Sequence, residues 1–173
     1  RHDVLVIAPD VVGRGQSDWL ENPLHYHAGV YAADMQVLIA QVQSAMPKRL
    51  PLIWLGTSMG GLIALATAAG KPDFCDKLIL NDVAPRLEWD ALARIGDYIG
   101  TDPHFATQHE ALDYCKALSV SFGRLSEEEW LRINTPQLRH RCDVEGRDAA
   151  CDLQRPWHLH YDPKIAALTK ALP

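Results

Sequence analysis

The chain has 173 residues, of which 47% are hydrophobic and 23% are charged, an ordinary composition for a globular domain. Its net charge of -5 and its pI near 5.9 give no basic signature of a protein that binds nucleic acid or anionic membranes. No apolar run approaches the roughly 20 residues that a membrane-spanning helix needs. We therefore expect neither nucleic acid nor a membrane as a partner.

The cysteines are widely spaced and form no CxxC pair: Cys75, Cys115, Cys142 and Cys151. This pattern predicts reduced thiols and a cytoplasmic protein rather than a disulfide framework. One set of side chains could in principle bind a metal: His140, Cys142, Cys151, His158 and His160. The two cysteines of this set are too far apart for a known zinc motif, so no metal is expected.

In the first half of the chain, strand-like and helix-like segments alternate. Val4–Ala8, Pro51–Leu55 and Lys77–Leu80 are short continuous apolar runs, typical of strands covered on both faces of a parallel sheet. The segment between the first two runs carries a helical apolar stripe of Met35, Leu38, Ile39, Val42 and Met46, which Pro47 ends. Gly60–Ala69 is apolar nearly all round and predicts a buried helix. The resulting βαβαβ order predicts a parallel sheet with right-handed crossovers.

After Asp82 the pattern becomes helical. Three segments read as helices: 87–99, 106–119 and 126–141. Ser126 and Glu129 form a capping box at the start of the third, and Pro136 is expected to break that helix near Thr135. No strand is expected within this block, which we interpret as a separate helical layer.

Gly56-Thr57-Ser58-Met59-Gly60 matches the G-x-S-x-G nucleophile elbow. An apolar strand precedes it and a buried helix follows at once, as the elbow requires. Ser58 should have a strained backbone with positive φ, and the Met59 N–H should be available to a developing oxyanion. Gly56 and Gly60 are expected to be glycine because a side chain there would collide with neighbouring backbone, and Gly61 extends the motif. A plain glycine-rich turn is the alternative interpretation.

A second glycine-rich segment, from Asp10 to Asp18, contains Gly13 and Gly15. A dinucleotide-binding fingerprint would need a third glycine where Asp18 stands, and a P-loop would need Lys followed by Ser or Thr. On physical grounds alone the segment predicts a tight turn that leaves a strand.

The runs PDVVGRGQSDWL, LGTSMGGLIAL and KLILNDVAP, in this order and spacing, resemble the α/β-hydrolase fold, most closely enol-lactonases and proline iminopeptidases. The resemblance implies part of a doubly wound, mostly parallel sheet with an inserted helical cap. Residues 1–85 would then form a partial core, 86–160 the cap, and 161–173 a return segment. It also implies Ser58 as nucleophile, Met59 as an oxyanion donor, and no cofactor.

In such proteins the acid and the histidine of the triad follow strands that this chain does not contain. Several residues could substitute for them: Asp34, Asp82, His104, His109, His158 and His160. Asp82 fits better as a turn residue, Asp34 as a residue in the first turn of its helix, and the histidines as surface or packing groups.

We therefore expect hydrolysis of a small ester, lactone or related carbonyl compound through an acyl-enzyme in the intact protein, with this chain inert by itself. A non-catalytic remnant or a binding protein that kept the fold is the alternative. The expected partner is a small-molecule substrate, and the sequence does not define an oligomeric state.

Overall fold

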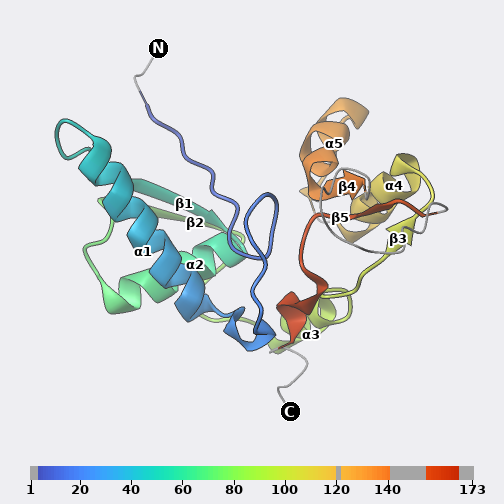
Figure 1. The fold of residues 1–173 in the computed structure, drawn as a ribbon, viewed down its shortest axis with the longest axis horizontal. Helices are drawn as coiled ribbons and strands as arrows, with labels where there is room; N and C mark the ends of the chain where they lie inside the picture. Colours follow the sequence, from blue (N-terminus) through green and yellow to red (C-terminus); the bar gives the residue numbers. More distant parts are fainter. Residues whose placement is uncertain (1–3, 120–121, 141–154, 168–173) are drawn as a thin grey trace. The chain divides into compact units, whose positions relative to one another are not determined.

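The computed structural model describes residues 4–119, 122–140 and 155–167, and the chain divides into two compact units (Figure 1). The parallel unit comprises residues 20–99 and 166–173, and the antiparallel unit comprises residues 1–19 and 100–165. Each unit is described by itself. The division into residues 1–85, 86–160 and 161–173 therefore stays a prediction, as does the placement of 87–141 over the edge of the sheet that carries Ser58.

The parallel unit has the predicted alternation of helices and strands. Its elements are the 3-10 helix η1 (Pro23–His25), α1 (Ala28–Ala45), β1 (Ile53–Thr57), α2 (Met59–Gly70), β2 (Lys77–Asn81) and α3 (Trp89–Gly96). β1 and β2 pair in parallel, from Ile53 opposite Lys77 to Thr57 opposite Asn81. Because a parallel pair needs a crossover connection, α2 returns the chain to the start of β2.

Helix α1 packs on α2, and α2 packs on the strands (Figure 1). The buried residues of this unit include Tyr31, Met35, Ile63, Ala64 and Phe74. The predicted stripe on α1 is confirmed at Met35, which is buried, and the helix ends at Ala45, before Pro47. The core of the parallel unit is therefore a helical layer on one face of the strand pair.

The other face of the strand pair is not covered by the described residues. Ile53, Leu55 and Ile79 are 57%, 65% and 48% exposed. The expectation that both faces of these strands are buried is therefore wrong for this part of the chain. An apolar run indicates where a strand can be buried, whereas actual burial depends on which other segments are present to cover it.

The predicted strand Val4–Ala8 is not a strand. Residues 4–10 form no ladder, and Val6 is 80% exposed. A β-strand is defined by hydrogen bonds to a neighbour, and no described residue pairs with this run. The strand that the resemblance places between this run and β1 is not found among the described residues.

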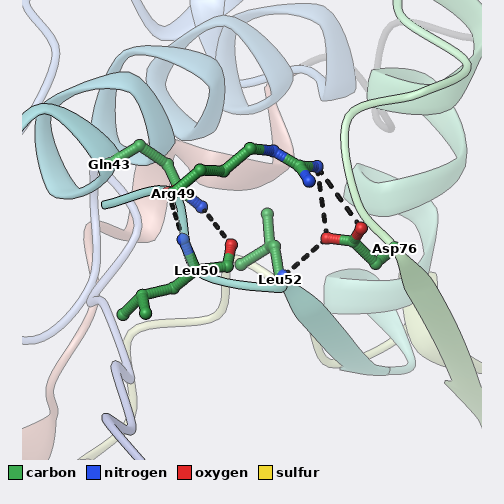
Figure 2. A network of polar contacts seen from close by, with 5 residues as sticks. All are labelled: Gln43, Arg49, Leu50, Leu52 and Asp76. Carbon is green, nitrogen blue, oxygen red and sulfur yellow. Dashed lines mark hydrogen bonds and ion pairs between the residues drawn. The ribbon is translucent and has the colours of Figure 1, made fainter. Parts of the chain in front are cut away.

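A polar network fixes the start of β1 (Figure 2). The Asp76 carboxylate accepts the Leu52 N–H at 2.8 Å, and both of its oxygens lie 3.3 Å from Nη2 of Arg49. The Gln43 side chain donates to the Leu50 carbonyl at 2.9 Å and accepts the Leu50 N–H at 3.1 Å. These contacts join the end of α1 to the segments that lead into β1 and β2, which sets the register of the strand pair.

The antiparallel unit contains a small sheet that the sequence did not predict. Its elements are β3 (His104–Phe105), α4 (Gln108–Leu118), α5 (Glu127–Asn134), the 3-10 helix η3 (Thr135–Gln137), β4 (Leu138–His140) and β5 (Trp157–Leu159); a further 3-10 helix, η5 (Pro163–Ala166), runs from this unit into the other. The strand order is β3-β5-β4 and all pairing is antiparallel. The expectation of a purely helical block is therefore wrong, because strands of two or three residues leave almost no periodic signal.

The helix signals of this unit are confirmed. Ser126 and Glu129 form the predicted capping box, each side chain accepting the backbone N–H of the other. Helix α5 ends at Asn134, and the chain continues as a 3-10 turn through Pro136 rather than as a helix to residue 141. Proline lacks an N–H and disfavours a helical residue before it, which accounts for the break.

In the described part of the chain, Cys75 and Cys115 are free thiols, while Cys142 and Cys151 lie outside it. Burial raises the pKa of both free thiols.

No helix among the described residues has the length and apolar character needed to cross a bilayer. The same residues bring together no group of three potential metal ligands.

Candidate active site

Ser58 lies at the junction of β1 and α2. β1 ends at Thr57, α2 begins at Met59, and Ser58 between them has φ 49° and ψ −118°. Positive φ is unusual for a residue with a side chain and costs about 1 to 3 kcal/mol, so it persists only where the surroundings enforce it. The strained strand-to-helix turn predicted for Ser58 is confirmed, whereas its role as nucleophile stays a prediction.

Two glycines make this turn possible by allowing close backbone approach. A Cβ on Gly56 would lie 2.6 Å from the Gly60 carbonyl oxygen and 2.6 Å from the Gly61 nitrogen. A Cβ on Gly61 would lie 2.3 Å from Cγ1 of Val83 and 3.1 Å from the Gly56 carbonyl oxygen. The steric reason predicted for Gly56 is confirmed, but the same reason is wrong for Gly60, where a Cβ would meet no atom within 4 Å. The first turn of α2 approaches the strand through Gly61, one residue later than predicted.

The first N–H groups of α2 differ in whether a described residue accepts them. The N–H groups of Gly61 and Leu62 donate to the Ser58 carbonyl at 2.9 and 3.2 Å. Within the described residues, no acceptor takes the Met59 N–H, in keeping with its place at a helix N-terminus. The helix dipole adds partial positive charge at this end. That residues 56–61 line a concave pocket stays a prediction.

The end of β2 supports the elbow from the side. The Ser58 N–H donates to the Asn81 carbonyl at 3.0 Å, and the Asn81 side-chain amide donates to the Thr57 hydroxyl at 3.2 Å. Asp82, the next residue, has φ 56°, so positive φ occurs at the ends of two adjacent strands. No described residue hydrogen bonds to the Asp82 carboxylate, so the turn hydrogen bonds expected of it are not found.

The segment after Asp10 is a tight turn in the antiparallel unit, as predicted, although the described residues before it form no strand. Gly13 and Gly15 have φ of 85° and 54°. The Asp10 carboxylate accepts the Gln16 N–H at 3.0 Å, and the Ser17 hydroxyl donates to the Asp10 carbonyl at 2.6 Å. A Cβ on Gly15 would lie 2.2 Å from the Asp10 carboxyl carbon. Gly13 is therefore required for its positive φ. Gly15 is required both for its positive φ and for its close contact with the Asp10 side chain.

This turn is tied to the residues that follow β5. The Gly15 N–H donates to the His160 carbonyl at 3.0 Å, and the Asp162 N–H donates to the Gly13 carbonyl at 2.8 Å. Tyr161 also donates its hydroxyl to the Thr101 carbonyl at 2.6 Å. The two ends of the segment 101–161 are thereby joined to each other and to the turn.

The histidines considered as substitute bases lie in the antiparallel unit, whereas Ser58 lies in the parallel unit. His104 Nε2 lies 3.2 Å from the Asp102 carboxylate, and His109 Nε2 lies 3.5 Å from that of Asp113. Because the units are described separately, the expectation that these histidines are beyond hydrogen-bond reach of Ser58 stays a prediction. Asp34 is not in the first turn of its helix, because α1 begins at Ala28.

Sequence reasoning missed that β3, β5 and β4 bring His104, His158 and Arg139 side by side. His104 is the register partner of His158, and His158 is that of Arg139. The alternation Trp157-His158-Leu159-His160 was the available signal, since it is the period-2 pattern of a half-buried strand. This run is too short to predict a strand before the partner strands are known.

Comparison with known proteins identifies the family. The serine aminopeptidase S33 family matches residues 1–101, more than half of the chain. A 3-hydroxybutyrate-oligomer hydrolase from Cupriavidus necator is 40% identical over 164 residues, which cover 95% of this chain and 52% of that protein. Human monoglyceride lipase is 38% identical over 78 residues, which cover 45% of this chain and 25% of that protein.

A solved α/β hydrolase from Novosphingobium aromaticivorans aligns with a TM-score of 0.71 at 29% identity, over 91% of this chain and 50% of that structure. The fold is thus part of the α/β-hydrolase fold, as the motifs predicted. The chain belongs to the serine aminopeptidase S33 family of hydrolases. It spans about half the length of the Cupriavidus and Novosphingobium proteins.

Proposed function

We propose that the intact protein hydrolyses small carboxylic esters through an acyl-enzyme on Ser58. The backbone of Ser58 carries this proposal, with its φ of 49° directly between a parallel strand and a helix. A nucleophile elbow of this geometry presents the serine hydroxyl above the sheet edge. The Met59 N–H, one residue on, has no acceptor among the described residues.

The reaction follows from these groups. The Ser58 oxygen attacks the ester carbonyl carbon as a base takes its proton, and the Met59 N–H stabilises the oxyanion. The alcohol then leaves with a proton, and water hydrolyses the acyl-enzyme to the acid and free Ser58. The base is a histidine oriented by an acid, both supplied by the rest of the protein, as the resemblance implies.

The relative from Cupriavidus necator suggests the substrate class. Its name refers to oligomers of 3-hydroxybutyrate, and its 40% identity extends over both units of this chain. Such oligomers are short chains of esters between hydroxy acids, which agrees with the small ester predicted from the sequence. We therefore propose short hydroxy-acid esters as the substrate and the 3-hydroxybutyrate dimer as the first compound to test.

Replacement of Ser58 in the full-length protein tests the proposal. Ser58→Ala should lower kcat/KM for the 3-hydroxybutyrate dimer and for p-nitrophenyl butyrate by about 10⁴ to 10⁶, because the triad acts as a unit. Ser44→Ala, an exposed position on α1, is the matched control and should retain full activity. A fluorophosphonate should label the wild type and not Ser58→Ala.

Two results would contradict the proposal. If the full-length wild type hydrolyses neither ester and resists the fluorophosphonate, the fold serves a non-catalytic role. If Ser58→Ala keeps a tenth or more of the activity, the nucleophile is elsewhere.

The 173-residue chain alone should be nearly inactive, since general-base help is worth about 10² to 10⁴ in rate.

A further inference from the structure

One face of the small antiparallel sheet carries a row of basic side chains. His104 on β3, His158 on β5 and Arg139 on β4 are successive register partners, so they project from the same face. The rings of His104 and His158 stack with centroids 6.0 Å apart, and Arg139 Nη1 lies 3.1 Å from Nε2 of His160. These four residues, His104, His158, Arg139 and His160, are called the basic row.

The opposite face of the same sheet is apolar and packs against α4. Phe105, Leu138, Trp157 and Leu159 contact a buried cluster on that helix, formed by Ala111, Leu112 and Cys115. Because successive side chains of a strand alternate between faces, the basic row points away from this core. All four of its members are half-buried, which limits their hydration while leaving them accessible.

His104 and Arg139 of the basic row differ in their contacts with carboxylates of the described residues. Asp102 contacts His104, but no carboxylate in the described ranges forms an ion pair with Arg139. Nδ1 of His104 is buried and has no hydrogen-bond partner among the same residues. Because a guanidinium can only donate, Nε2 of His160 accepts the Arg139 N–H without a proton of its own. Burial and the Arg139 charge also lower the pKa of His160, and the opposing effect of Asp10 is smaller. The guanidinium thus keeps its charge beside a neutral acceptor.

We propose that the basic row is a binding site for a small organic carboxylate, with Arg139 as its charged anchor. A guanidinium presents parallel N–H donors that match the two oxygens of a carboxylate, and the neighbouring imidazoles can donate a further hydrogen bond. A bound anion would also neutralise the Arg139 charge, which no carboxylate of the described residues pairs. The choice of carboxylate over other anions rests on the proposed function, because hydrolysis of a hydroxy-acid ester releases one.

Calorimetric titration of the full-length Ser58→Ala protein tests this site, since that variant cannot consume an ester ligand. The 3-hydroxybutyrate anion should bind with a Kd of about 1 mM, a typical value for so small a ligand, whereas its neutral methyl ester should bind at least tenfold more weakly. Adding Arg139→Gln should weaken binding of the anion about tenfold or more, because a hydrogen bond between two charged groups is lost. Arg132→Gln, at an exposed position of α5, should leave it unchanged.

Several outcomes would overturn the inference: saturable binding absent up to about 50 mM, equal binding of the methyl ester, or equal weakening by Arg139→Gln and Arg132→Gln. If Arg139→Gln fails to fold by circular dichroism, His104→Gln replaces it, with an expected loss of about threefold to tenfold. These failures leave hydrolysis by Ser58 intact. Conversely, a wild type without Ser58-dependent hydrolysis removes the reason for choosing a carboxylate but leaves the measured binding in place.

Discussion

The two glycine-rich turns of this chain use glycine for different reasons. In the turn after Asp10, Gly13 and Gly15 themselves adopt positive φ, as glycine does without strain. At the elbow the residue with positive φ is Ser58, and the glycines beside it provide space for backbone contact. The first turn therefore avoids strain, whereas the second places strain on Ser58, the proposed nucleophile.

The largest expected effect comes from filling the space at the elbow. Gly56→Ala should lower the free energy of unfolding by about 3 kcal/mol, because its Cβ would lie 2.6 Å from backbone atoms that cannot rotate away. Gly60→Ala is the matched control and should raise stability by about 0.5 kcal/mol, since alanine is the better helix former and space is free. Urea unfolding of the full-length protein measures both. Equal losses of stability at Gly56 and Gly60 would show that the space available to a Cβ does not explain the need for glycine at the elbow.

A smaller effect is expected at the first turn. Gly15→Ala should cost about 2 kcal/mol, partly from its φ of 54° and partly from the clash with the Asp10 carboxylate. In an Asp10→Ala background the clash disappears, and the same substitution should cost only about 1 kcal/mol. Urea unfolding of the two single variants and the double variant gives the coupling between the positions. If the losses simply add, the carboxylate does not constrain Gly15.

The smallest effect concerns the strand that leads into the elbow. The Leu52 N–H and, after it, Arg49 hold the pKa of Asp76 below its usual range. Stability from this carboxylate is therefore present above the unfolded-state pKa of about 3.9 and is lost as the pH falls through the lower folded-state pKa. Asp76→Asn should flatten the dependence of unfolding free energy on pH below about pH 4.5. Asp73→Asn, an exposed neighbour, should leave the slope unchanged; identical slopes for both variants would exclude this role for Asp76.

The elbow could be predicted from the sequence because its causes are local. Gly56 and Ser58 act within a few residues of one another, and the flanking strand and helix have continuous apolar patterns. The second close-approach glycine lies one residue later than predicted, because its place depends on how the first turn of α2 meets the strand. The position of Val83, after β2, decides that detail.

The basic row could not be predicted because its causes are distant in the sequence. His104 and His158 become neighbours only through pairing of strands two or three residues long. Such short strands are stabilised by long-range pairing and by packing on α4, not by a propensity that a local window would show. The prediction of a strand at Val4–Ala8 was wrong for the opposite reason. Its local apolar pattern is strong, but no described residue pairs with it.

The hydrogen bond from the Ser58 N–H to the Asn81 carbonyl makes the serine the last rung of the β1–β2 ladder. Its amide hydrogen can exchange with solvent deuterium only when that ladder opens, whereas the adjacent Met59 amide has no such protection from the described residues. Slow exchange of the Ser58 amide beside fast exchange of the Met59 amide would show that the sheet holds the serine in place while the next amide stays exposed. Fraying of α2 from its far end would then leave the serine where it is.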